Sequence, residues 1–196
     1  MFINKALQEI NLKIVYYGPG LSGKTTNLEH IYTRLDPTMR SELVSLKTRE
    51  ERTLYFDFMQ LELGRVKGMK PRFNLYTVPG QVYYNFSRKI ILRGVDGIVF
   101  VADSQKDRMG ENLDSLLDLE KNLIEMGLSL QNIPWVIQYN KRDLPDIEFI
   151  RAMQSKLNFF GVPHTEAVAS RGIEVISTLK IIISEVVSKM DVLAEQ

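Results

Sequence analysis

Apolar runs and helical apolar periods alternate along this chain. Three short runs, Asn11–Tyr17, Gly97–Asp103 and Ile133–Tyr139, are almost continuously apolar, which predicts strands buried on both faces of a sheet. In the stretches that separate and follow them, apolar residues recur every three or four positions, which predicts amphipathic helices. The clearest of these helical stretches lie near 109–126 and over Ile173–Met190.

One segment has a different pattern. Apolar and polar residues alternate over Leu54–Gln60, which predicts a half-buried strand. This alternation places Phe56 and Phe58 on the apolar face of the strand and Asp57 on the other face. A hairpin then returns the chain as Arg72–Val78, so this pair of strands is expected to supply the antiparallel edge of the sheet.

Strands separated by helices are typical of an α/β fold, in which right-handed crossovers connect parallel strands. We therefore expect a mostly parallel sheet with one antiparallel edge strand and helices on both faces. The chain of 196 residues contains no linker rich in Pro, Gly or Ser and no internal repeat, and its length suits one core. Residues 1–196 are accordingly predicted to form a single domain.

Composition excludes several classes of function. Lys+Arg 25 against Asp+Glu 24 gives a formal net charge of +1, so no nucleic-acid partner is expected, and the basic cluster Arg88-Lys89 with Arg93 is interpreted as a solvated helix face. No apolar run approaches the ~18 residues that span a membrane. Without a cysteine or a glycine at position 2, no lipid anchor is expected. We expect a cytoplasmic protein whose recruitment to a cell pole would need protein partners.

A phosphate-binding motif directly follows the first predicted strand. The segment Gly18-Pro-Gly-Leu-Ser-Gly-Lys-Thr25 matches G-x-x-x-x-G-K-[ST], and a helical period to about Arg34 follows it. Glycines allow the backbone N–H groups to surround phosphates, and Lys24 can reach the terminal phosphates. The hydroxyl of Thr25 suits Mg²⁺, which prefers oxygen ligands. The predicted phosphate-binding residues are Gly18, Gly20, Leu21, Ser22, Gly23, Lys24, Thr25 and Thr26.

A second motif, Asn140-Lys141-Arg142-Asp143, directly follows the strand predicted at Ile133–Tyr139. Ligands of α/β sheets bind at the carboxyl ends of the strands, so the motif is expected at the nucleotide. The Asp143 carboxylate can accept hydrogen bonds from the ring N–H and the exocyclic amine of guanine, whereas adenine presents a lone pair at the matching nitrogen. The stem of Lys141 can cover the base, and Asn140 can tie the strand end to the phosphate loop. The motif favours a guanine nucleotide and disfavours a P-loop kinase.

Together with three further segments, these motifs resemble those of small Ras-like GTPases, and specifically of the bacterial gliding-motility GTPase family (MglA-like). The resemblance covers nearly the whole chain. It implies a switch that binds GTP or GDP with Mg²⁺, hydrolyses GTP and directs cell polarity, gliding or type IV pilus motility. It also implies a Roadblock-domain activating protein and polarity and motility effectors as partners. The segments that carry the resemblance lie at 17–28, 51–58, 76–81, 93–104 and 140–145.

The resemblance assigns further site residues. Gln81 matches the glutamine that orients the attacking water, and the N–H of Gly80 would meet the γ-phosphate. A guanine loop is implied at Glu166–Ser170, where the N–H of Ala169 would meet the guanine oxygen. Relatives usually have Ser-Ala-Lys at this point, and Val168 begins the different Val-Ala-Ser of this chain.

The polar stretch Asp36–Thr53 is predicted to be a long loop, and two residues at its end are candidates for catalysis. Arg52 resembles an arginine finger supplied by the protein's own chain, although it also ends the charged run Arg49-Glu-Glu-Arg. Thr53 is our candidate for the threonine that closes on Mg²⁺, with Thr48 as the alternative.

One residue departs from the pattern of Ras-like GTPases. Thr77 stands where D-x-x-G has the aspartate that holds Mg²⁺ through water. A hydroxyl is a poorer substitute, so slow intrinsic hydrolysis is expected without an activating partner. Either Asp57 or Asp103 is a candidate to supply the missing carboxylate. The alternative function is a GTP-held scaffold that hydrolyses little.

Overall fold

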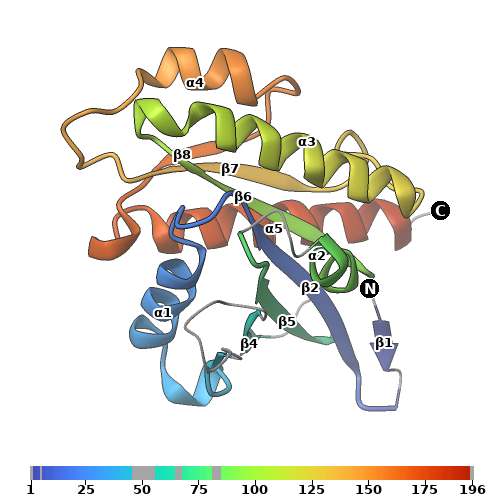
Figure 1. Cartoon of the computed structure of the whole chain (residues 1–196). Helices are drawn as coiled ribbons and strands as arrows, with labels where there is room; N and C mark the ends of the chain where they lie inside the picture. The colour runs from blue at the N-terminus through green and yellow to red at the C-terminus, as the bar shows by residue number, and fades with distance from the viewer. Residues whose placement is uncertain (1, 5, 46–55, 65–67, 81–84, 195–196) are drawn as a thin grey trace.

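The computed structural model describes residues 2–4, 6–45, 56–64, 68–80 and 85–194, and these form one eight-stranded sheet with helices on both faces (Figure 1). The order of strands across the sheet is β3-β4-β5-β2-β6-β7-β8, and β1 pairs with β2 outside this path. The strands are β1 (Phe2–Asn4), β2 (Glu9–Tyr17), β3 (Val44–Ser45), β4 (Asp57–Glu62), β5 (Lys70–Thr77), β6 (Gly97–Asp103), β7 (Trp135–Asn140) and β8 (His164–Glu166).

The centre of the sheet is parallel. β2 pairs in parallel with β5 and β6, and β7 continues this arrangement to β8. β4 is antiparallel to β5, as the hairpin pattern predicted. The predicted α/β fold class is confirmed. The sequence pattern did not indicate three short strands: β1 and β3, which add antiparallel pairs to β2 and β4, and β8, which pairs in parallel with β7.

The helices lie in two layers. α2 (Asn85–Leu92), α3 (Met109–Glu125) and α4 (Ile150–Leu157) cover one face of the sheet, whereas α1 (Lys24–Arg34) and α5 (Val175–Ala194) cover the other (Figure 1). None of the helices in the described part of the chain is both long and apolar enough to cross a membrane. The described part of the predicted loop at 36–53 contains the 3₁₀ turn Pro37–Met39 as well as β3.

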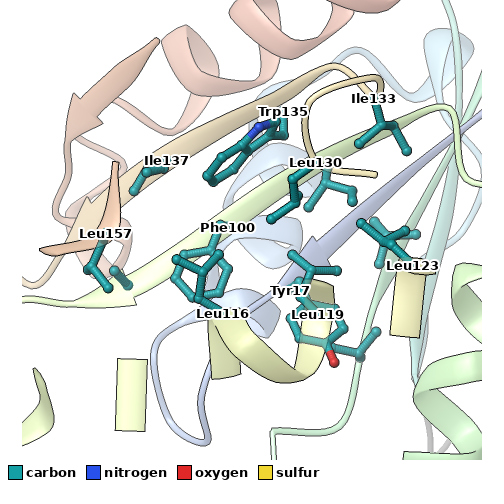
Figure 2. Packing of buried hydrophobic residues seen from close by; sticks show 14 of the residues in the cluster. Tyr17, Phe100, Leu116, Leu119, Leu123, Leu130, Ile133, Trp135, Ile137 and Leu157 are labelled. Atoms are coloured by element: carbon teal, nitrogen blue, oxygen red, sulfur yellow. The ribbon is translucent and has the colours of Figure 1, made fainter. Parts of the chain in front are cut away.

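Each central strand contributes to two hydrophobic cores. On β2, Val15 and Tyr17 pack in the core beneath α2, α3 and α4, while Ile14 and Tyr16 point to the core beneath α1 and α5. Figure 2 shows the first core, where Trp135 and Ile137 of β7 lie with leucines of α3. Burial of both faces explains why the central strands are apolar without alternation.

The exposed and buried faces of β4 are opposite to those predicted. Met59 and Leu61 are fully buried against the α1 side, and Asp57 on the same face is 2% exposed. Phe58 lies on the half-buried face, where its ring centroid is 4.9 Å from that of Tyr76. Because both faces carry apolar residues, the alternation alone did not distinguish them. The inward face also places a carboxylate inside the protein.

Candidate functional site

The phosphate loop lies between β2 and α1, where its motif predicted it. Its first and last glycines, Gly18 (φ +144°) and Gly23 (φ +101°), adopt positive φ angles that favour glycine. A Cβ on Gly18 would lie 2.2 Å from the carbonyl oxygen of Val101, and a Cβ on Gly23 would lie 2.2 Å from Nδ2 of Asn140. These glycines therefore allow the loop to pack directly against the ends of β6 and β7.

Lys24, the first residue of α1, points into this loop. Its Nζ donates hydrogen bonds to the carbonyl oxygens of Gly18 (3.0 Å) and Pro19 (2.6 Å), and the residue is 6% exposed. Desolvation and, secondarily, the charge of Arg88 lower the pKa of Lys24 to about 7, while Asp57 opposes this shift. The amine thus lies where phosphate oxygens would accept its hydrogen bonds in place of the loop carbonyls.

Two hollows meet at the phosphate loop, and Leu21, Gly23 and Thr26 line both of them. Leu21 itself is 86% exposed and adopts a positive φ of 61°. The structure therefore brings the two sequence motifs together at one edge of the sheet. The phosphate-side hollow is lined by Leu21, Gly23, Lys24, Thr25, Thr26, Thr77, Val78, Pro79 and Gly80. The base-side hollow is lined by Leu21, Gly23, Thr26, Asn140, Lys141, Asp143, Leu144, Ala169 and Ser170.

The turn after β5 lies directly on the phosphate loop. A Cβ on Gly80 would be 2.3 Å from Cα of Gly20 and 2.9 Å from the carbonyl carbon of Pro19, so only glycine fits at position 80 without displacing this backbone. Gly80 was predicted to meet the γ-phosphate. Its place beside Gly20 and in the hollow of Lys24 is compatible with that role.

Asn140, at the end of β7, ties three segments together. Its Nδ2 donates to the carbonyl oxygen of Ser22 (2.7 Å), and its Oδ1 accepts a hydrogen bond from the N–H of Ala169 (2.8 Å). The residue is 2% exposed, so both bonds are shielded from water. The predicted tie between the strand end and the phosphate loop is present. Val168 precedes Ala169 and is paired with Ile173 through its backbone.

The bond between Asn140 and Ala169 also bears on the predicted guanine contact. The N–H of Ala169 was expected to meet the guanine oxygen, yet in this structure it already has an acceptor within the chain. Asn140 would have to share this N–H with the base. The side chains of Lys141 and Asp143 border the same hollow, and Asp143 is exposed.

The buried carboxylate of Asp57 lies beside the phosphate-side hollow, and three hydroxyls from the described part of the chain contact it. Oδ2 accepts hydrogen bonds from Oγ1 of Thr25 (2.6 Å) and Oγ1 of Thr77 (2.8 Å), and Oδ1 accepts one from Oγ of Ser45 (2.6 Å). Thr77 also accepts a hydrogen bond from the N–H of Asp57 (2.9 Å). Among the described residues, no lysine or arginine forms an ion pair with Asp57, so neutral groups donate its hydrogen bonds, while the charge of Lys24 attracts it without direct contact.

This oxygen-rich set suits Mg²⁺. Thr25, the predicted metal residue of the phosphate loop, already contacts the Asp57 carboxylate. Mg²⁺ uses few protein ligands together with phosphate oxygens and water, so one hydroxyl and one carboxylate beside the phosphate loop are sufficient protein donors. The Thr77 hydroxyl would then orient the carboxylate.

The other candidate carboxylate, Asp103, has a different set of partners. It is fully buried at the end of β6, and its Oδ2 accepts a hydrogen bond from Nζ of Lys141 (2.6 Å). Gln105 donates to both of its oxygens. Asp103 therefore anchors the base-binding motif, and Asp57 is the carboxylate that the structure brings to Thr25.

Four residues singled out from the sequence lie outside the described part of the chain: Arg52, Thr53, Thr48 and Gln81. Their proposed roles remain predictions. Sequence reasoning missed Arg108, whose guanidinium donates to the carbonyl oxygen of Gly20 (2.8 Å) from the start of α3. No motif marks this arginine, because the contact joins residues 88 positions apart.

Two comparisons with known proteins agree with this geometry. The whole chain, residues 1–196, matches the model of the ADP-ribosylation factor family (Arf). The chain is also 53% identical over 189 residues to the "Mutual gliding-motility protein MglA" of Myxococcus xanthus (strain DK1622). That match covers 96% of this chain and 97% of the relative. The chain therefore belongs to the ADP-ribosylation factor family and is a small GTPase with a Ras-like fold.

Proposed function

We propose that this GTPase is a guanine-nucleotide switch of cell polarity that directs gliding or type IV pilus motility from the cytoplasm. Residues 1–196 act in this proposal as one GTPase domain. The motility role rests on the similarity to the Myxococcus relative, whose name refers to gliding. A Roadblock-domain activating protein and polarity effectors are the proposed partners. One observation supports a guanine nucleotide as the ligand: the phosphate loop and the base motif lie together at one edge of the sheet.

We assign the binding roles by position in the two hollows. The backbone of the phosphate loop and Lys24 bind the phosphates, Asp143 accepts the two hydrogen bonds of guanine, and the Lys141 stem covers the base. Thr25 and Asp57 would hold Mg²⁺, which neutralises charge on the phosphate oxygens when bound. In this proposal Thr53 completes the metal site, with Gln81 and Arg52 acting on the transferred phosphoryl group.

Single-turnover release of phosphate from GTP tests the proposal. With Mg²⁺, we expect slow release from GTP, no comparable release from ATP, and loss of release in the Gln81→Leu variant, because no other proposed group orients the water. Equal use of ATP would contradict the assignment of Asp143. Tight GTP binding without any release would instead favour a GTP-held scaffold. The ATP reaction and GTP binding by the variant are the controls.

Nucleotide affinity should depend on pH through Lys24. Since its pKa is lowered to about 7, the amine of the nucleotide-free protein is charged below this pH and neutral above it. Bound phosphate favours the ammonium, so binding above about pH 7 should take up one proton and weaken by up to about tenfold per pH unit. Below about pH 7, the contribution of Lys24 to nucleotide affinity should not change with pH.

Calorimetric titration with GDP in two buffers of different ionisation enthalpy measures this proton uptake. The uptake should grow as the pH rises from about 6 to about 8. The Lys24→Met variant provides the control, since it cannot take up the proton at this position. Proton uptake that is the same at every pH would contradict the assignment.

A further inference from the structure

Arg88 of α2 has the largest side chain among the fully buried residues that the structure describes, and it has no part in the roles assigned above. It was interpreted from the sequence as part of a solvated basic face, but it is only 2% exposed, so that interpretation was wrong. Its guanidinium donates from Nε to the carbonyl oxygen of Pro79 (2.9 Å) and from a terminal nitrogen to that of Gly80 (2.7 Å). The other terminal nitrogen pairs with Oδ2 of Asp118 at 2.6 Å.

Asp118 fixes this guanidinium to the body of the protein. The same Oδ2 accepts hydrogen bonds from the hydroxyl of Tyr17 (2.5 Å) and from Nδ2 of Asn122 (3.1 Å). Tyr17 ends β2, and its ring lies among the leucines of α3 in Figure 2. A buried ion pair is costly unless further hydrogen bonds satisfy both partners, and here they do. Arg88 therefore joins the turn after β5 to β2 and α3.

This contact determines the orientation of one backbone N–H group. None of the described peptide bonds is cis, and in a trans peptide the C=O and the following N–H point in opposite directions. Arg88 holds the carbonyl of Pro79, so the N–H of Gly80 points away from the guanidinium. Gly80 also packs on Gly20 and lines the hollow that contains Lys24. Because Arg88 contacts Gly80, its guanidinium is also close to this hollow, and its charge contributes, after desolvation, to the lowered pKa of Lys24.

We propose that Arg88 is a positioning residue that holds the Gly80 N–H toward the γ-phosphate and thereby favours GTP over GDP. The inference rests on the proposed function, because it requires the γ-phosphate to bind in the phosphate-side hollow. Arg88 does not touch the nucleotide in this proposal. It acts through the Pro79–Gly80 peptide. Asp118 contributes indirectly, because it holds the Arg88 guanidinium that contacts this peptide.

The test compares the affinities of the full chain for GDP and for the slowly hydrolysed analogue GTPγS, both with Mg²⁺. Arg88→Lys keeps the charge but loses the planar fork that reaches two carbonyls and a carboxylate at once. We expect about tenfold weaker binding of GTPγS and unchanged binding of GDP, since one charge-assisted contact is lost only in the triphosphate complex. Asp118→Asn should shift the ratio of GTPγS affinity to GDP affinity in the same direction, although Arg88 itself is not substituted in this variant.

A matched control lies one residue along α2. Lys89 pairs with Glu125 at 2.5 Å across the same two helices, but this pair is partly exposed. Lys89→Gln should leave the ratio of the two affinities unchanged.

An equal loss of GDP and GTPγS binding in Arg88→Lys, or an unchanged ratio in both Arg88→Lys and Asp118→Asn, would overturn the inference. Failure of the unaltered chain to bind either nucleotide would instead overturn the proposed function. Should Arg88→Lys not fold, Asp118→Asn alone decides.

Discussion

Asp143→Asn should weaken the binding of GDP and GTP by about a thousandfold and at the same time create affinity for xanthine nucleotides. In the proposed base site the carboxylate would accept hydrogen bonds from the ring N–H and the amine of guanine, and an amide could accept only one of them. Its NH₂ group would then face the guanine amine, donor against donor. Xanthine carries a carbonyl oxygen in place of that amine, so the asparagine amide would donate to it.

The exposed position of Asp143 allows its contact with the base to be tested without a change in the fold. Asp143 is exposed and lines the base-side hollow, so the substitution should not disturb the core. Asp146 offers a matched control, because it lies on the same loop, is 80% exposed and pairs with Lys106 at 2.7 Å. Asp146→Asn makes the same change in charge and should leave the preference for guanine intact. Equilibrium titration with GDP and with xanthosine diphosphate measures both variants. Equal affinity of Asp143→Asn and the unaltered chain for GDP would refute the assignment.

The parts of the site that the sequence predicted are those that local chemistry determines. The phosphate loop needs glycine at positive φ and a lysine at the start of a helix, all within a short stretch of chain. Asn140 is the last residue of β7, and its place at the site followed from the rule that ligands of α/β sheets bind at the carboxyl ends of the strands. The α/β fold followed in the same way from apolar runs separated by helical periods.

The parts that could not be predicted depend on contacts between distant segments. The choice between Asp57 and Asp103 requires the register of β4 on β5, which places Phe58 opposite Tyr76 and turns Asp57 inward. Arg88 has the sequence context of an exposed residue. Its burial depends on Asp118, which lies 30 positions along the chain on another helix. Neither pairing leaves a local signal in the sequence.

Asp57→Asn should remove most of the effect of Mg²⁺ on nucleotide binding. The carboxylate lies 2.6 Å from the Thr25 hydroxyl, and its charge is the feature that would attract the ion. An amide keeps the shape and can still pair with the hydroxyls of Ser45 and Thr77, but it carries no charge. We expect the gain in GDP affinity that Mg²⁺ provides to fall by about ten- to a hundredfold. The nucleotide-free protein should melt at a higher temperature, because the hydrogen-bond donors that the described residues provide to this buried charge are all neutral and the charge has been removed.

The Asp103→Asn variant separates a metal role from general damage to the site. Asp103 is equally buried, but it pairs with Lys141 of the base motif and has no contact with Thr25. Its loss should therefore weaken GDP binding to the same extent with Mg²⁺ and with a chelator present. GDP dissociation rates measured in both conditions distinguish the two carboxylates. If Asp57→Asn retained the full Mg²⁺ effect while Asp103→Asn lost it, Asp103 and not Asp57 would be the carboxylate of the metal site. Thr77 could then no longer be explained as the residue that orients the metal-binding carboxylate.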